Sequence, residues 1–151
     1  MLTFNLCYGL SYVVQRCLYQ EEIRDEILVM IVNQTWLNPN DINQERGWVL
    51  LSLCLGCFAP SEKLYPYLLC HVTAHAYEKY KGYCQAKLLM SYERQARQFP
   101  PSLLEWECAS TCSPMAISVQ MFDGVTKVSS NFSIYSGFEY SINSSMYKKS
   151  S

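Results

Sequence analysis

The sequence predicts a mainly α-helical fold that is followed by a β-hairpin and a disordered tail. Apolar residues recur at helical spacing through most of the first 112 residues, and turns with capping residues separate these helical stretches. After residue 113 the apolar pattern changes to strict alternation. The expected organisation is therefore a helical domain over 1–112, a hairpin segment over 113–128 and a disordered tail over 129–151.

Three helices are expected between residues 21 and 81. The second opens at Asp41, where Gln44 three residues later indicates a capping box. The third follows Ser61, and Pro66 is tolerated only in its first turn. The inward-facing positions expected on the three helices are Ile23, Ile27, Met30, Ile31 and Gln34, then Trp48, Leu51, Leu55 and Phe58, then Leu64, Leu68 and Val72.

Two further helices and a hairpin complete the expected elements. A helix over 83–98 is followed by a short helix with a second capping box, Ser102 to Glu105. Residues 116–121 alternate between apolar and small or polar, and Asp123-Gly124 is a hairpin turn signal, so we expect a hairpin over 116–128. The inward positions expected on the helix over 83–98 are Leu88, Leu89 and Tyr92.

The composition limits the class of protein. Half of the 151 residues are apolar and 17% are charged, which is sufficient for a packed core. The formal net charge of −1 disfavours a protein that coats nucleic acid, because such proteins are strongly basic. No apolar run reaches the length of a membrane span. We therefore expect neither a nucleic-acid partner nor a membrane span.

The eight cysteines allow two interpretations. An even number is compatible with a disulfide framework in a secreted protein, and formal glycosylation sequons begin at Asn33, Asn131 and Asn143. However, the apolar start of the chain lacks the basic region and the small-residue cleavage site of a signal peptide. We expect an intracellular protein with reduced thiols and unused sequons.

Cys54, Cys57, His71 and His75 form the pattern C-x2-C-x13-H-x3-H, which lies within the range of small zinc sites. A zinc-binding module is therefore one alternative function. A zinc finger holds its two cysteines in a hairpin, whereas both cysteines here continue the apolar helical stripe of Trp48. Free cysteine in such a setting behaves as a small hydrophobic residue. We expect a core role for the cysteines, and neither a metal nor another cofactor.

No catalytic motif accompanies these residues. The sequence contains no G-x-S-x-G element and no phosphate-cradling glycine loop. Cys57 lies near a predicted helix C-terminus, where the helix dipole disfavours a thiolate. We therefore expect neither a redox site nor a hydrolase site at these residues.

Several short motifs are more specific than the zinc-like spacing when they are taken together. They are Arg24-Asp25-Glu26, Glu45-Arg46-Gly47-Trp48, Phe58-x-Pro60-Ser61, Pro66 and Pro100-Pro101-Ser102-x-Leu104-Glu105. Their order and spacing resemble the MyTH4 (myosin tail homology 4) domain of unconventional myosin tails, some plant kinesins and PH–MyTH4–FERM adaptors. The hairpin after residue 113 resembles the start of the ubiquitin-like first lobe of a FERM domain, which follows MyTH4 in that family.

The resemblance implies a non-catalytic cytoskeletal adaptor in the cytoplasm. Its expected partners are microtubules or cargo peptides, and the rest of a myosin-like tail with its FERM domain. The family has further helices before the segment that matches Cys17, and the FERM resemblance stops near Val128. We therefore expect a helical bundle that is incomplete at its N-terminus, in a truncated fragment or isoform. A non-functional truncated product is a further alternative.

Basic residues between positions 62 and 97 are the candidate partner-binding surface. Six basic residues in this segment stand against only Glu62, Glu78 and Glu93. Such an excess would complement an acidic tubulin surface or an acidic cargo segment, although an ordinary solvated face has the same composition. The candidates are Lys63, Lys79, Lys81, Lys87, Arg94 and Arg97.

Structural roles are predicted for three other motif residues. Gly47 inside a helix indicates the close approach of a neighbouring helix, because glycine costs about 1 kcal/mol relative to alanine there. Trp48 is expected in the core rather than at a ligand site. Arg46 is predicted to pair with Asp25 or Glu26 across a helix interface, the alternative being a solvated helix N-terminus.

Overall fold

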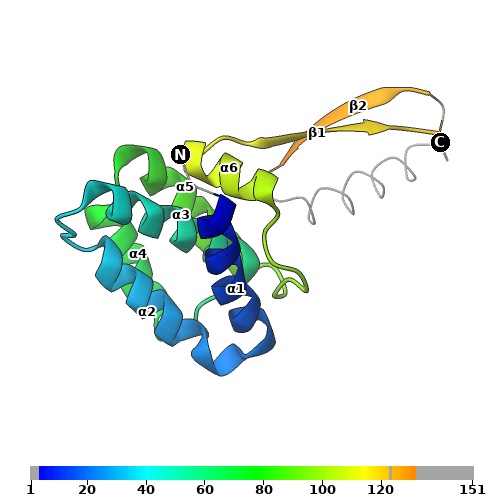
Figure 1. Ribbon diagram of the computed structural model, residues 1–151. Helices are drawn as coiled ribbons and strands as arrows, with labels where there is room; N and C mark the ends of the chain where they lie inside the picture. The colour runs from blue at the N-terminus through cyan, green and yellow to red at the C-terminus, as the bar shows by residue number, and fades with distance from the viewer. Residues whose placement is uncertain (1–3, 123, 132–151) are drawn as a thin grey trace. The chain divides into compact units, whose positions relative to one another are not determined.

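The computed structural model describes residues 4–122 and 124–131 of the 151-residue chain, which separates into two compact units, 1–112 and 113–151 (Figure 1). Helix α3 is the central helix of the first unit and contacts α1, α2, α5 and α6. None of the helices in the described residues is long and apolar enough to cross a lipid bilayer. The elements of the first unit are α1 (Phe4–Tyr19), the 3-10 helix η1 (Glu21–Ile23), α2 (Arg24–Thr35), α3 (Asp41–Cys57), α4 (Tyr65–His75), α5 (Glu78–Ser91) and α6 (Leu103–Thr111).

Helix α3 is central because it is apolar on all sides. Every residue from 47 to 55 is buried, so this helix has no solvent face along most of its length. The predicted inward positions Trp48, Leu51, Leu55 and Phe58 are all buried, which confirms that stripe. The neighbouring elements supply the large buried side chains that surround α3, namely Leu28, Leu68, Tyr80, Leu88 and Trp106.

Three of the predicted helix starts can be compared with the observed caps. The Ser102–Glu105 capping box is present with both of its hydrogen bonds, and Pro66 lies in the first turn of α4. The predicted cap of α3 is wrong by one residue. Asn40 is the capping residue, and its side-chain oxygen accepts a hydrogen bond from the main-chain N–H of Asn43 at 3.0 Å.

Two predicted apolar faces are partly wrong. Helix α2 buries Leu28 and Ile31, whereas Met30 is 58% exposed. The reason is that α2 packs on α3 with one narrow face, and Met30 lies outside that face. Helix α5 ends at residue 91, so Tyr92 leaves the helix and its hydroxyl donates to the carbonyl oxygen of Pro60 at 3.0 Å. Leu89, which was also predicted to be inward, is 60% exposed.

The predicted close approach at Gly47 is confirmed. A Cβ atom built on Gly47 of α3 would lie 2.6 Å from Cγ2 of Thr35, the last residue of α2. That distance is shorter than carbon atoms tolerate, so only glycine allows the two helices to approach this closely. The Thr35 hydroxyl donates to the carbonyl oxygen of Val32 and lies 2.8 Å from Nε2 of His71, which connects α2 to α4.

The second unit contains two antiparallel strands, β1 (Met115–Gln120) and β2 (Thr126–Asn131). Met115 lies opposite Asn131 and Gln120 lies opposite Thr126. In the connection, Gly124 has φ of 79°, a left-handed conformation that glycine adopts without steric cost. The assignment of this hairpin to a FERM lobe stays a prediction, and most of the predicted disordered tail, 132–151, lies outside the described residues.

Candidate partner-binding site

The six basic residues predicted to bind a partner do not form one surface. Lys87 and the side chain of Arg97 are buried or nearly so, and they belong to the interior of the helical unit. Lys79 is at the surface but forms an ion pair with Glu45 of α3. The members that remain at the surface without an ion pair among the described residues are Lys63, Lys81 and Arg94.

Arg97 is a structural residue at the C-terminus of α3. Its Nη1 and Nη2 atoms lie 2.8 Å and 3.1 Å from the two carboxylate oxygens of Glu105, and the two side chains are only 11% and 7% exposed. Its main-chain N–H donates to the carbonyl oxygen of Cys57 at 2.8 Å. Burial alone would raise the pKa of Glu105, but the hydrogen bonds and charge of Arg97 and the hydrogen bonds of Ser102 outweigh it and lower that pKa.

Lys87 packs against the same end of α3. Its Nζ lies 4.9 Å from the centre of the Tyr83 ring, and a Cβ on Gly56 would come within 3.1 Å of that atom. The last turn of a helix carries partial negative charge, which favours an ammonium group there. Burial lowers the pKa of Lys87, although the neighbouring Cys57 and Glu105 oppose that shift. Lys87 is therefore unavailable to a partner.

The zinc-like residues are divided between the core and α4. Cys54 and Cys57 are buried in α3, while the ring of His71 stacks on Trp48 with centroids 5.2 Å apart and an angle of 16° between planes. Burial raises the pKa of Cys57 to about 11 despite the nearby Arg97, and it raises the pKa of Cys54 well above its ordinary value, so both thiols stay protonated at neutral pH. In the described part of the chain, no group of three or more His, Cys, Asp or Glu residues could hold a metal ion.

The predicted ion pair between Arg46 and Asp25 or Glu26 is wrong. Arg46 donates to Oδ1 of Asn43, one turn earlier on its own helix, at 3.4 Å. Asp25 Oδ1 instead accepts the main-chain N–H of Ser61 at 2.9 Å. The local reason is that α2 begins beside the turn before α4, and a free main-chain N–H there is nearer to Asp25 than any guanidinium.

Arg24, the first residue of α2, connects that helix to α1 and to Phe58, the residue that follows α3. Its Nε donates to the carbonyl oxygen of Cys17 at 2.9 Å, and its guanidinium lies 5.5 Å from the centre of the Phe58 ring. Together with the bond from Ser61 to Asp25, these contacts bring two of the sequence motifs into one junction. The motifs thus fix where α2 and α4 begin relative to each other.

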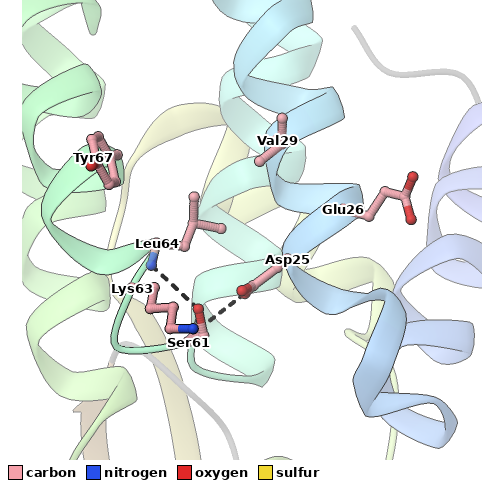
Figure 2. A pocket seen from close by; sticks show the side chains of 7 residues that line it. All are labelled: Asp25, Glu26, Val29, Ser61, Lys63, Leu64 and Tyr67. Carbon is pink, nitrogen blue, oxygen red and sulfur yellow. Dashed lines mark hydrogen bonds between the residues drawn. The ribbon is translucent and has the colours of Figure 1, made fainter.

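A groove opens at this junction, between the first turns of α2 and α4 (Figure 2). It has a volume of about 480 Å³. Asp25 and Lys63 lie at one end, and the exposed ring of Tyr67 stands on the α4 side, opposite Val29 of α2 (Figure 2). The residues that line the groove are Asp25, Glu26, Val29, Ser61, Lys63, Leu64 and Tyr67.

Five of these residues have sequence-based expectations, but the apolar surface between them does not. Asp25, Glu26 and Ser61 were expected as structural motif residues, Leu64 as an inward-facing residue and Lys63 as a partner-binding residue. Val29 and Tyr67, for which no role was expected, are 42% and 73% exposed. The available signal was that both are large apolar or aromatic side chains outside the inward stripe of their helices.

The chain resembles known proteins in sequence. The MyTH4 domain family matches residues 10–108. Unconventional myosin-XV of Homo sapiens is 40% identical over 121 residues, and myosin-VIIa of Drosophila melanogaster is 36% identical over 118 residues. These matches include 76% and 78% of the chain but span only 3% and 5% of the length of the two relatives.

Solved structures share the fold. The C-terminal MyTH4-FERM domain of human myosin 7b, solved in complex with the harmonin-a PDZ3 domain, superposes with a TM-score of 0.77 at 22% identity. The MyTH4-FERM MF1 domain of Dictyostelium discoideum myosin VII gives a TM-score of 0.74, also at 22% identity. The matches cover 85% and 84% of this chain and 27% of each of the other two chains.

Proposed function

Because the chain belongs to the MyTH4 domain family, a protein-binding module of unconventional myosin tails, we propose that it holds a cargo protein in such a tail through the groove between α2 and α4. The supporting observation is the exposed apolar surface of Val29 and Tyr67 at that groove. Exposed apolar surface rimmed by polar residues is typical of protein interaction sites. The module works by binding, without chemistry of its own.

A cargo protein is favoured over microtubules as the partner because half of the predicted basic residues are buried or paired within the chain. Lys87 and Arg97 are internal, and Lys79 is neutralised by Glu45, so three dispersed cations remain from the six. An acidic polymer surface is complemented by concentrated positive charge, which this arrangement lacks. Of the six basic residues that were predicted to bind a partner, Lys63 is the one that lines the groove.

The hairpin of β1 and β2 is proposed to begin the first lobe of a FERM domain. The supporting observation is that both structural relatives join MyTH4 to FERM. The partners proposed for this chain are accordingly the rest of a myosin-like tail and its cargo, with the protein located in the cytoplasm on the cytoskeleton.

Site-specific photo-crosslinking tests this proposal. Benzoylphenylalanine replaces Tyr67 in the chain extended through a FERM domain, and a control carries it at Tyr12, a 61% exposed tyrosine on α1. Cells are irradiated, and adducts are identified by mass spectrometry. We expect a discrete adduct from position 67 that position 12 does not give, with a partner other than tubulin. Equal labelling from the two positions would refute the groove as the cargo site.

Microtubule co-sedimentation tests the competing function. We expect no salt-sensitive binding by the 151-residue chain. Salt-sensitive binding that is lost when Lys63 and Lys81 are changed to glutamate would replace the cargo proposal with microtubule attachment.

A further inference from the structure

Beyond the groove, further large apolar side chains are exposed on α2 and directly after it. Val29, Met30, Trp36 and Leu37 are 42%, 58%, 55% and 78% exposed. Val29 and Met30 lie on α2, and Trp36 and Leu37 directly follow Thr35, the last residue of that helix. We call this set, together with Tyr67 on α4, the outer strip.

Leu37 is held in an unfavourable conformation at one end of the outer strip. Its φ is 48°, in the left-handed region that side chains other than glycine and asparagine seldom adopt. Such backbone strain concentrates at binding and switch sites. The side chain is largely exposed, so burial of Leu37 within this chain does not offset the strain.

The opposite end of the outer strip is acidic. Glu22 and Glu26 are exposed there and form no hydrogen bond or ion pair with other described residues. Arg24, the nearest cation in sequence, is engaged by Glu21, by a carbonyl oxygen and by an aromatic ring. Among the described residues, the carboxylates at this end are Glu22, Asp25, Glu26 and Glu62, and Lys63 is the one cation there that forms no ion pair.

We propose that the groove and the outer strip bind a basic amphipathic helix of the cargo protein. A depression between two packed helices fits a third helix, whose apolar stripe would cover Val29, Leu64 and Tyr67. Lysine or arginine at one end of that helix would meet Glu26 and its neighbours, where the negative charge is unpaired. This inference rests on the proposed cargo function and specifies the chemical class of the segment that is bound.

Selection from a library of displayed helical peptides with randomised surfaces tests this inference on the 151-residue chain. We expect the enriched peptides to combine an apolar stripe with lysine or arginine at one end. One enriched peptide is then synthesised, and its affinity is measured by fluorescence anisotropy. Acidic or uncharged enriched sequences would overturn the proposal.

Groove variants and matched controls locate the binding of that peptide. We expect Tyr67→Ala and Val29→Glu to weaken it by at least about tenfold, since central aromatic and apolar anchors dominate such interfaces. Glu26→Lys should weaken it by about fivefold and reduce its salt dependence. The controls Tyr12→Ala and Glu93→Lys, which change exposed residues elsewhere, should bind as the unaltered chain does. Equal affinity for all variants would overturn the proposal.

Two further outcomes separate this inference from the proposed function. If position 67 crosslinks to a cargo segment that is acidic or non-helical, cargo binding stands and the basic-helix inference fails. If the chain dimerises in light scattering and Val29→Glu abolishes the dimer, a second copy occupies the groove and the inference also fails. Loss of both the crosslink and the peptide binding would overturn both proposals.

Discussion

The end of α3 and the groove between α2 and α4 contain the same types of charged residue in opposite roles. At the end of α3, Arg97 and Glu105 are almost completely buried and bonded to each other. At the groove, Glu26 and Lys63 are exposed and form no ion pair among the described residues. The difference teaches that burial and the position of a helix end, rather than residue type, decide whether a charge stabilises the fold or is available to a partner.

Removing a charge at the end of α3 should have the largest effect. We expect Glu105→Ala to lower the free energy of unfolding by about 3 kcal/mol, because Arg97 would keep a buried charge without its carboxylate. Urea denaturation measures the change. The control Glu107→Ala removes an exposed carboxylate from the same helix and should cost less than about 0.5 kcal/mol. Equal losses in the two variants would contradict the structural role of the pair.

The same pair should make stability fall in acid. The pKa of Glu105 is lower in the folded chain than its ordinary value of 4.5, so the unfolded chain binds the proton more readily. The stabilisation is therefore complete above pH 4.5 and is lost as the pH falls through the folded-state pKa. We expect Glu105→Ala to reduce the loss of unfolding free energy at acid pH. An unchanged pH dependence in this variant would refute the role of Glu105.

A smaller effect is expected where the C-terminal end of α2 meets α3. Gly47→Ala should destabilise the chain by roughly 1–2 kcal/mol, because the overlap with Thr35 exceeds the gain in helix propensity. Thr35→Ser removes the clashing methyl group and keeps the hydroxyl, so the penalty of Gly47→Ala should disappear in that background. Thermal melts of the four combinations measure the coupling.

Gly82→Ala is the matched control for that experiment. Gly82 lies in α5, and a Cβ there would meet nothing within 4 Å. We expect this variant to be more stable by up to about 1 kcal/mol. If Gly47→Ala were equally benign, the close contact between α2 and α3 would not exist in solution.

His71 of α4 contacts Thr35 of α2 and Trp48 of α3. Its titration should have a more modest effect on stability. Burial lowers the pKa of His71 below its ordinary value of 6.5, and the proximity of His75 lowers it further. The unfolded chain then binds the proton more readily, so stability should decrease as the pH falls below 6.5. NMR titration should give a pKa under 6.5 for His71, and His71→Gln should reduce this pH dependence. A value above 6.5 would contradict the prediction.

The elements that sequence predicts best are those whose determinants are local. The buried stripe on α3 and the capping box at Ser102 depend on residues within one or two turns, and both are confirmed. The close contact at Gly47 was also predictable, since an unfavourable glycine in a helix requires a packing reason.

Apart from the one-residue error at the cap of α3, the main errors concern contacts between segments that are distant in sequence. Arg97 caps α3 from 40 residues away, through Cys57, and no local pattern distinguishes that arginine from the exposed Arg94. The partner of Asp25 is a main-chain N–H, which sequence motifs do not reveal. Likewise, the groove depends on how α2 and α4 pack, so only the exposed apolar character of Tyr67 and Val29 was open to prediction.

The smallest effect on stability is expected at the groove itself. Tyr67→Ala removes a side chain that is 73% exposed, so the free energy of unfolding should change by less than about 0.5 kcal/mol. Urea denaturation of this variant should overlay that of the unaltered chain, although its peptide binding is weakened. A loss comparable to that of Glu105→Ala would mean that the Tyr67 ring stabilises the fold, and the distinction between the two regions would fail. An unchanged stability combined with lost binding would instead show that the groove is kept exposed for a partner.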